Sequence, residues 1–423
     1  MKTVVVGGGL AGLAAALELA DAGHAVTLLE ARPTLGGAVQ TLPERDGDPA
    51  PPPDNGQHVA LGCCTAYLAF LRRIGQAGSV RRSRLDLPVL DQGGVVGRIG
   101  PGALALARYR HLSLFERLRT ARVVRTLGQL DPEAHEGETF AALLRRLGQT
   151  EPAIERFWDV FIRPAVNLRS EEASAALGLF TVQTALLGDS GASDLVLPAA
   201  PLGAMHGEAA RRTLDAAGAQ VRVGARVESL EPSAVLLADG ERVSADAVVV
   251  AVPPAESARL LGEPDPALRD SPIVSVHLLF ARRLLAEPLA ALLSSPAHWV
   301  FDRGELTGRP PGRGQYLTVV SSGAPELMAL RGRELVDLMA AELTSRLGAA
   351  ELLWSRVSRE PAATFAGVPG SAARRRLAET GRENVVRAGA WTSTGWPATM
   401  EGAVRSGQAA ARVLLSAREK VAA

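Results

Sequence analysis

Hydrophobic residues near the N-terminus follow the pattern of a strand, a helix and a second strand. Thr3–Val6 is a β-branched run, Leu10–Ala22 is an Ala- and Leu-rich helical segment, and Ala25–Leu29 is a second apolar run. Gly23 ends the helix between them. This order predicts the start of a parallel α/β sheet.

Apolar patterns farther along predict a second, larger block. Helical spacing in YLAFLRRIG and FAALLRRLG leads us to expect mostly helices over residues 59–185. Residues 194–230 predict a loop, a helix and a strand. They are followed by a hairpin that turns at Asp239-Gly240 and a buried strand that ends at Pro253. Residues 260–380 combine the strands IVSVHLLF and YLTVV with a helix at Glu334–Leu347.

Composition bounds the class of protein. A chain of 423 residues is longer than a single hydrophobic core usually supports, so we expect two domains. The net charge of +1 gives the protein no overall positive potential that would attract nucleic acid. No window holds the roughly 18–20 apolar residues of a membrane span. The two cysteines, Cys63 and Cys64, are adjacent and make neither a disulfide framework nor a zinc site, which favours a cytoplasmic protein.

The turn after the first strand carries candidate binding chemistry. Gly7, Gly9 and Gly12 form G-x-G-x-x-G around Leu10 and Ala11, at the junction of strand and helix where this pattern binds dinucleotides. The helix N-terminus supplies N–H groups and partial positive charge to a pyrophosphate. Glu30 ends the second strand and is placed to accept the ribose hydroxyls. The motif alone leaves NAD and FAD open.

The residues after Glu30 separate the two cofactors. The segment ARPTLGG, with Ala31, Arg32, Gly36 and Gly37, resembles the R-x-x-x-G-G segment of the FAD-binding amine oxidase and isoprenoid desaturase superfamily. That superfamily usually has Arg after the glycine pair, where this chain has Ala38. The resemblance implies FAD as the cofactor.

The resemblance also implies a fold and further contacts with FAD. It implies an α/β fold in which a Rossmann-like FAD-binding domain (1–70, 190–260 and 385–423) is interleaved with an α+β substrate domain (71–189 and 261–384). In GARVESL, Val227 would cover the adenine. The strand VVVAVPP, with Ala251, would close the sheet.

A narrower resemblance extends over the whole chain. DNGQHVALGCC, FIRPAVNLRS, ASDLVLPAAPLG and GWPATMEGAVRSG are similar to segments of the hydroxysqualene dehydroxylases. This implies a bacterial enzyme of hopanoid and squalene synthesis that removes the allylic hydroxyl of a C30 isoprenoid, with reduced FAD as hydride donor. The chain has no second G-x-G-x-x-G, so an external electron donor, NAD(P)H or a reductase, is expected.

The segment Asp54–His58 carries the candidate acid for loss of the hydroxyl. A carboxylate at Asp54 would favour protonated His58. The alternative is that both residues only form hydrogen bonds to flavin or backbone. Gly56, Gln57 and His58 are also candidate flavin contacts by the resemblance, whereas the polar Arg163 and Asn167 in FIRPAVN are interpreted as structural.

The C-terminal segment is expected to return to the first domain. By the resemblance, Gly389 and Ala390 contact the cofactor, and Ala398, Thr399 and Met400 present a helix N-terminus to the N1–O2 side of the flavin. The glycines and alanines in EGAVRSGQAAA would let this helix pack against the glycine-rich one. The superfamily carries Asp where this chain has Ala390, so the affinity for FAD is left open.

Three rival functions remain at this stage. An amine oxidase is disfavoured because the only lysines, Lys2 and Lys420, lie at the termini and the chain has only three tyrosines. An oxidative isoprenoid desaturase or porphyrinogen oxidase shares fold and flavin but reverses the electron flow. A flavin-binding adaptor that hands on substrate would catalyse no reaction.

The segment Leu106–Thr126 carries six arginines against one acid, Glu116. Leu112, Phe115 and Leu118 are predicted to share one helical face, with Arg122 and Arg125 at its edge. One interpretation is a solvated basic surface helix. The other is a helix that docks on anionic lipid, which would place the protein on the inner face of the cell membrane.

Overall fold

The glycine-rich N-terminal segment forms the predicted strand, helix and strand. In the computed structural model, which describes the backbone of residues 1–422 and the side chains of residues 1–416, these elements are β1 (Lys2–Val6), α1 (Leu10–Asp21) and β2 (Ala25–Glu30). β1 and β2 pair in parallel, so the predicted α/β class is confirmed.

A five-stranded parallel sheet is built around β1 from distant parts of the chain. Its order is β18-β12-β1-β2-β8, with β8 (Gln220–Val223), β12 (Ala247–Val250) and β18 (Val385–Arg387). We predicted that VVVAVPP closes the sheet, and this was wrong: β18 lies outside β12. A three-residue strand is too short for a periodic pattern to reveal it.

Beside this sheet lies a three-stranded antiparallel one, β11-β10-β9. It comprises β9 (Val227–Glu231), β10 (Ala234–Leu237) and β11 (Arg242–Ser244), and its second hairpin turns at the predicted Asp239-Gly240.

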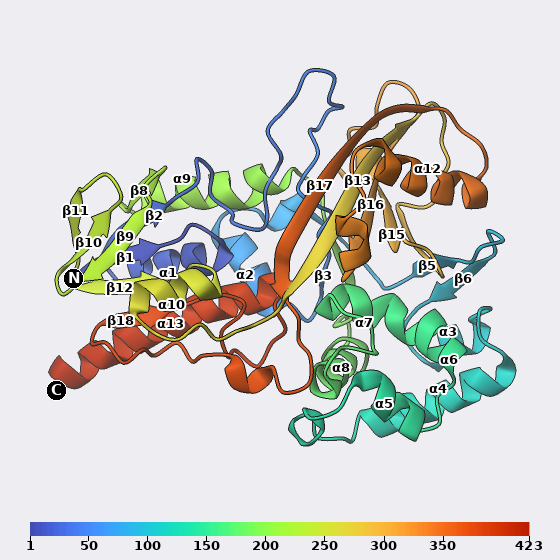
Figure 1. The fold of residues 1–423 in the computed structure, drawn as a ribbon, viewed down its shortest axis with the longest axis horizontal. Helices are drawn as coiled ribbons and strands as arrows, with labels where there is room; N and C mark the ends of the chain where they lie inside the picture. Colours follow the sequence, from blue (N-terminus) through green and yellow to red (C-terminus); the bar gives the residue numbers. More distant parts are fainter. Residues whose placement is uncertain (423) are drawn as a thin grey trace.

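The right half of the molecule in Figure 1 is organised by a seven-stranded sheet, β17-β13-β16-β15-β14-β5-β6. The bounds are β5 (Leu87–Leu90), β6 (Val96–Ile99), β13 (Asp270–Phe280), β14 (Leu289–Leu292), β15 (Trp299–Asp302), β16 (Gln315–Ser322) and β17 (Leu352–Phe365). The predicted strands IVSVHLLF and YLTVV are confirmed as β13 and β16. One face packs on α12 (Arg333–Leu347), the predicted helix.

Helices fill most of residues 59–185, as predicted, but the prediction missed strands. The helices are α2 (Thr65–Arg73), α3 (Ala103–Arg108), α4 (Leu114–Leu127), α5 (Phe140–Arg146), α6 (Glu151–Ala153), α7 (Asp159–Val166) and α8 (Ala175–Thr181). β5 and β6 interrupt them, as do β3 (Ala60–Leu61) and β4 (Val80–Ser83). β3 and β4 pair with β7 (Leu195–Pro198), which we had predicted to be a loop. These strands are short, and they form because they pair with strands that are distant in the sequence.

The C-terminal helix returns to the N-terminal one. α13 (Met400–Ala422) packs along α1, as predicted, and the contact is close: a Cβ added to Gly407 would lie 2.1 Å from the carbonyl oxygen of Ala11. The remaining helices are α9 (Ala209–Ala216), α10 (Pro254–Leu261) and α11 (Arg303–Leu306). Both termini lie at the end of the molecule opposite to α3 and α4 (Figure 1).

One sequence prediction on the arginine-rich segment was wrong. Leu112 precedes α4 and is 1% exposed, so it belongs to the core under the helix. Leu114 takes its place on the exposed face with Phe115 and Leu118. No helix among the described residues combines the length and apolar character needed to cross a membrane.

Candidate flavin and substrate site

The glycine motif forms a tightly packed turn at the carboxyl end of β1. A Cβ on Gly12 would lie 1.9 Å from the carbonyl oxygen of Gly7, and one on Gly7 would lie 2.3 Å from that of Ala251. A Cβ on Gly9 would find only the Gly37 Cα, at 3.7 Å. Gly7 and Gly12 are therefore required by the protein's own packing, whereas Gly9 leaves open backbone of the kind that a pyrophosphate approaches.

The predicted glycine pair lies directly beside this turn. Gly36 pairs with Gly9 and donates its N–H to the Gly8 carbonyl at 2.8 Å. A Cβ on Gly37 would come within 2.8 Å of the Gly9 Cα. Ala38, at the position where the superfamily has Arg, is exposed beside Gly37.

Glu30 lies at the end of β2, within reach of the motif. Its carboxylate accepts N–H bonds from Gly8 at 2.7 Å and from Arg32 at 2.8 Å. Ala31 and Arg32 are exposed. The chain reaches Val227 through Ala225, whose N–H donates to the Glu30 carbonyl at 2.9 Å. The acidic residue and the predicted adenine cover are thus neighbours.

The C-terminal segment reaches the glycine motif from the side of β12. The Ala388 N–H bonds to the Val250 carbonyl, and the Trp391 indole N–H donates to the carbonyl of Val252 at 3.1 Å. These bonds hold Gly389 and Ala390 beside Ala251 at the end of β12. Ala398, Thr399 and Met400 are half-buried at the start of α13. The backbone cradle, the open face of Gly9 and the carboxylate at Glu30 fit a dinucleotide such as FAD.

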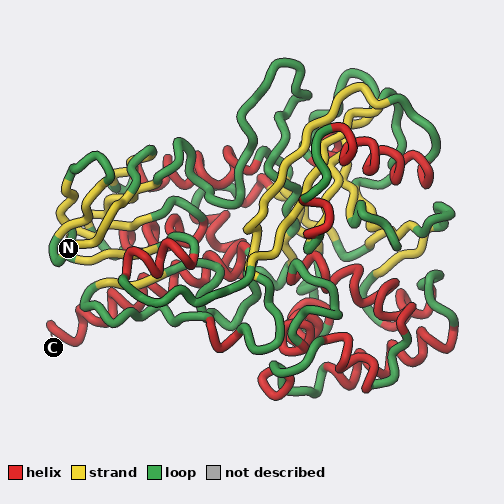
Figure 2. Tube along the Cα trace, viewed as in Figure 1, coloured by secondary structure: helices red, strands yellow, loops and turns green. Residues whose placement is uncertain are grey.

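The loop between β2 and β3 carries Asp54–His58 to the junction of the two halves. The loop is drawn in green at the top of Figure 2. Its Asn55 side chain donates to the Ala38 carbonyl at 2.7 Å, so the two predicted segments lie together. On its other side, a Cβ on Gly56 would come within 2.8 Å of the Ser275 hydroxyl on β13.

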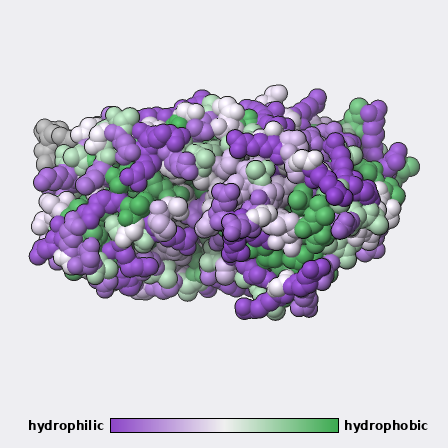
Figure 3. Space-filling view, turned by 90° about the horizontal axis from the view of Figure 1, so that it is seen from above, coloured by the Kyte–Doolittle hydropathy of each residue, from purple (hydrophilic) through white to green (hydrophobic). Residues whose placement is uncertain are grey.

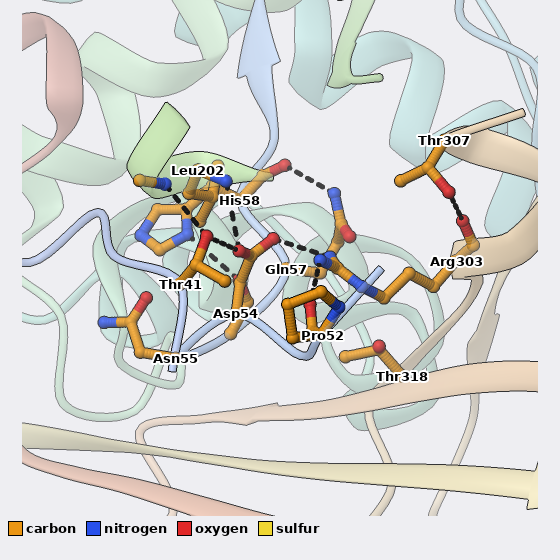
Figure 4. A network of polar contacts seen from close by, with 12 residues as sticks. Thr41, Pro52, Asp54, Asn55, Gln57, His58, Leu202, Arg303, Thr307 and Thr318 are labelled. Carbon is orange, nitrogen blue, oxygen red and sulfur yellow. Dashed lines mark hydrogen bonds and ion pairs between the residues drawn. The ribbon is translucent and has the colours of Figure 1, made fainter. Parts of the chain in front are cut away.

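Asp54 is fully engaged by protein groups (Figure 4). One carboxylate oxygen accepts from the Thr41 hydroxyl at 2.7 Å and from the Leu202 N–H at 3.0 Å. The other accepts from Arg303 Nη1 at 2.5 Å. Both members of this ion pair are 2% exposed. Because three donors of the protein already bond to this carboxylate, the alternative in which Asp54 only forms hydrogen bonds is favoured.

His58 lies beside this network, and burial determines its charge. Burial lowers the pKa of His58, although the Gly56 carbonyl and the Asp54 carboxylate oppose the shift. The Nδ1 atom lies 3.3 Å from the Gly56 carbonyl oxygen, which can only accept. We expected the carboxylate to favour protonated His58, but burial outweighs it. Gln57 is half-buried and donates to the His58 carbonyl at 3.2 Å.

Arg303 was missed by the sequence analysis. It lies at the start of α11 and also donates to the Pro52 carbonyl at 2.7 Å. A second buried arginine, Arg356 on β17, pairs with Asp48 on the loop that also carries Asp54. No local pattern distinguishes these two from the many other arginines.

Arg163 and Asn167 do not reach Asp54 through any bond in the described part of the chain. Arg163 donates to the carbonyl groups of Ser322 and Gly323, at 2.8 and 2.9 Å. The Asn167 side chain accepts the Gly323 N–H and donates to the Ser271 carbonyl. They tie α7 to the ends of β13 and β16, which matches their interpretation as structural.

Comparison with known proteins gives these features a family. Residues 10–415 match the model of the flavin-containing amine oxidoreductases. The chain is 30% identical to the hydroxysqualene dehydroxylase of Rhodopseudomonas palustris, over 98% of this chain and 99% of that protein. It is 27% identical to the hydroxysqualene dehydroxylase of Sinorhizobium fredii, over 97% and 98%. The solved structure of cyclohexylamine oxidase from Brevibacterium oxydans matches 99% of each chain with a TM-score of 0.73 at 20% identity.

The family match and the full-length relatives agree with each other, and they confirm the resemblance found in the sequence. The chain therefore belongs to the flavin-containing amine oxidoreductase family and is an FAD-dependent oxidoreductase whose full-length relatives include hydroxysqualene dehydroxylases.

Proposed function

We propose that the protein removes the allylic hydroxyl of hydroxysqualene to give squalene, in the squalene branch that feeds hopanoid synthesis. The kinship with hydroxysqualene dehydroxylases along nearly the whole chain carries this proposal. The C–O bond breaks, a proton and the hydroxyl leave as water, and a hydride takes the vacated carbon. Because the departing hydroxyl leaves an allylic, delocalised cation, the reaction is plausible in a site that excludes water.

We place FAD beside the glycine motif and the two returning segments. The turn that Gly7 and Gly12 shape would receive the pyrophosphate at the open backbone of Gly9, and Glu30 would accept the ribose hydroxyls. Residues 36–38 and 56–58 would run beside the ribityl chain and the ring, with residues 398–400 at the pyrimidine end. When bound and reduced, FAD supplies the hydride. An external donor, NAD(P)H or a reductase, would reduce it.

We assign different roles to the two residues of the predicted acid pair. Asp54 would be a positioning residue, because Arg303, Thr41 and Leu202 already occupy its oxygens. His58 would deliver the proton to the leaving oxygen. Its lowered pKa makes the imidazolium a stronger acid but a minor species at neutral pH.

An anaerobic single turnover tests the reaction. Reduced enzyme mixed with hydroxysqualene should form squalene and oxidised flavin in equal amounts. Unchanged hydroxysqualene with flavin that stays reduced would reject the proposal and favour a substrate-transfer adaptor.

The second candidate, an oxidative isoprenoid desaturase, calls for the reverse experiment. Oxidised enzyme mixed with squalene should leave the flavin oxidised. Bleaching of the flavin with formation of a new double bond would favour the desaturase. An amine oxidase is disfavoured, because Lys2 lies at the start of β1, at the opposite end from the glycine turn, and Lys420 lies outside the residues whose side chains are described.

A lipid substrate also bears on where the enzyme works. We propose a cytoplasmic protein held peripherally on the inner face of the cell membrane, where a C30 isoprenoid is dissolved.

A further inference from the structure

Exposed apolar side chains are concentrated at one end of the molecule. Six of the ten large apolar side chains that are exposed on the described part of the chain lie between Val95 and Leu118. Four of them, Leu104, Leu114, Phe115 and Leu118, are each 60–73% exposed, and Val95 and Val96 complete the set. Figure 3 shows apolar side chains at the end of the molecule that carries β5, β6 and α3 in Figure 1.

These side chains belong to elements that pack together. α3 contacts both β6 and α4. Arg117 fixes the corner between the two helices by donating to the carbonyl groups of Ala107 at 2.7 Å and Leu112 at 2.8 Å. We call the six residues Val95, Val96, Leu104, Leu114, Phe115 and Leu118 the apolar edge. Exposed apolar side chains gathered on elements that contact one another are typical of an interaction surface rather than of ordinary solvent-facing surface.

Basic side chains accompany the apolar edge. The exposed basic residues are Arg108 on α3, Arg110 between the two helices, and Arg119, Arg122 and Arg125 on α4. On α4, Arg122 and Arg125 follow Leu114 and Leu118 along the same helical face, so the first turn is apolar and the later turns are basic.

The arginines of this segment lack acidic partners. Glu116, the only acid in the segment, is held by the Ser113 N–H at 2.8 Å and the Thr150 hydroxyl at 2.9 Å. Within residues 1–416, Arg108, Arg110, Arg122 and Arg125 form no ion pair. Some exposed arginines elsewhere are paired, as Arg145 is with Glu151 and Glu171, whereas others, such as Arg309 and Arg313, form no ion pair within residues 1–416. The local charge of this surface is therefore positive and would attract an anionic partner.

We propose that the apolar edge and its arginines dock on the surface of an anionic lipid bilayer. Leucine and phenylalanine side chains would enter the boundary between headgroups and acyl chains. The guanidinium groups, on long flexible stems, would reach the lipid phosphates. A protein partner would need shaped polar contacts, whereas the observed mixture of unpaired arginines and protruding leucines suits a fluid anionic surface. The proposed function gives the docking its purpose, which is access to a lipid substrate. The docking itself is argued from the surface alone.

Vesicle co-sedimentation of the FAD-loaded protein tests the docking. Vesicles of phosphatidylcholine alone should bind little protein, whereas vesicles with about one third phosphatidylglycerol should bind it at low salt and release it at high salt. The double variant Arg122→Gln/Arg125→Gln should weaken binding about 30-fold, from roughly 1 kcal/mol per arginine. The triple variant L114S/F115S/L118S should weaken it about tenfold or more.

Matched substitutions elsewhere serve as controls. Arg309→Gln/Arg313→Gln removes two exposed arginines, and Leu377→Ser removes a leucine that is 63% exposed outside the apolar edge. Both should bind vesicles as the parent does. Equal loss of binding in these controls, no binding of the parent to anionic vesicles, or a dimer in solution that the triple variant abolishes would overturn the docking.

Turnover of detergent-dispersed hydroxysqualene separates the two proposals. The double arginine variant and the triple variant of the apolar edge should both keep this activity. Both should lose activity on substrate that is embedded in vesicles. Absence of turnover in the parent, with vesicle binding intact, would reject the reaction and leave the docking standing.

Discussion

Arg303 and Asp54, 249 residues apart in sequence, form a buried ion pair that joins the part of the chain carrying the seven-stranded sheet to the loop of the candidate site. The carboxylate belongs to the segment that also contacts Ala38 beside the glycine pair. The guanidinium belongs to α11, directly after β15 of the seven-stranded sheet. The pair therefore fixes the position of Gly56–His58 between the two halves of the molecule.

The first prediction concerns this pair. Arg303→Met leaves the Asp54 charge buried without its cation, so we expect a loss of about 3–5 kcal/mol in the free energy of unfolding. Asp54→Asn/Arg303→Met should lose less than the sum of the single variants, because neither charge is then stranded. Denaturant unfolding of the FAD-loaded protein measures both. Arg145→Gln, which breaks exposed pairs, is the control at about 0–1 kcal/mol. Equal effects of Arg303→Met and Arg145→Gln would contradict the prediction.

The second prediction separates folding from cofactor binding at the glycine motif. Gly9→Ala adds a Cβ whose nearest neighbour is 3.7 Å away, so the protein without FAD should keep its melting temperature. The new methyl group lies where a pyrophosphate approaches, and we expect FAD binding at least about tenfold weaker. Gly12→Ala instead forces a contact of 1.9 Å with the Gly7 carbonyl and should destabilise the fold itself. Gly78→Ala, which meets nothing within 4 Å, should change neither quantity. Unaltered affinity in Gly9→Ala would place the pyrophosphate elsewhere.

The N-terminal unit was predictable from sequence because its causes are local. The run Thr3–Val6, the glycines and Glu30 set strand, turn and strand within thirty residues. The packing of α13 on α1 was predicted from the resemblance, and the small residues of the segment allow the close approach.

Features that depend on distant partners were not predictable. β18 and β5 are three and four residues long, too short to show a period, and they are strands because β12 and β14 pair with them. Arg303 becomes the partner of Asp54 only through the way in which the two halves of the molecule meet. The sequence around Arg303 therefore contains no sign of the pair. Leu112 has the spacing of an exposed helical face, but α4 begins after it, at Leu114.

The third prediction concerns the position where the superfamily has Arg. Ala38 is exposed beside Gly37, so a longer side chain has room. Ala38→Arg should tighten FAD binding about tenfold through a charge-assisted hydrogen bond to the cofactor. Titration of the protein without cofactor, followed by flavin fluorescence, measures the change. Ala38→Gln offers similar reach without the charge and should gain much less. An equal gain in both variants would show that the charge is irrelevant.

The fourth prediction concerns stability in acid. Burial lowers the pKa of His206 to about 4 and that of His277 to about 3. The unfolded chain protonates these groups near 6.5, so it binds more protons than the folded protein below that pH. Stability should be fully present above about pH 6.5 and fall as the pH drops toward 4. His206→Gln should reduce the slope of unfolding free energy against pH by about 1.4 kcal/mol per unit. An unchanged slope would mean that His206 does not titrate on unfolding.

The fifth prediction tests His58 as the proton donor, and it applies in the pH range where the protein stays folded. The pKa of His58 lies below its ordinary value of 6.5, so the protonated form is scarce at neutral pH and grows as the pH falls. With the chemical step limiting, kcat should therefore rise toward lower pH and level off below that lowered pKa. His58→Gln should abolish this rise and lower kcat by about 10²- to 10⁴-fold. His135→Gln, at a half-buried histidine bonded to Glu138 and outside the candidate site, should leave the profile unaltered. If His58→Gln kept the acid limb, the proton would come from another group, and His58 would join Asp54 as a residue that positions the site.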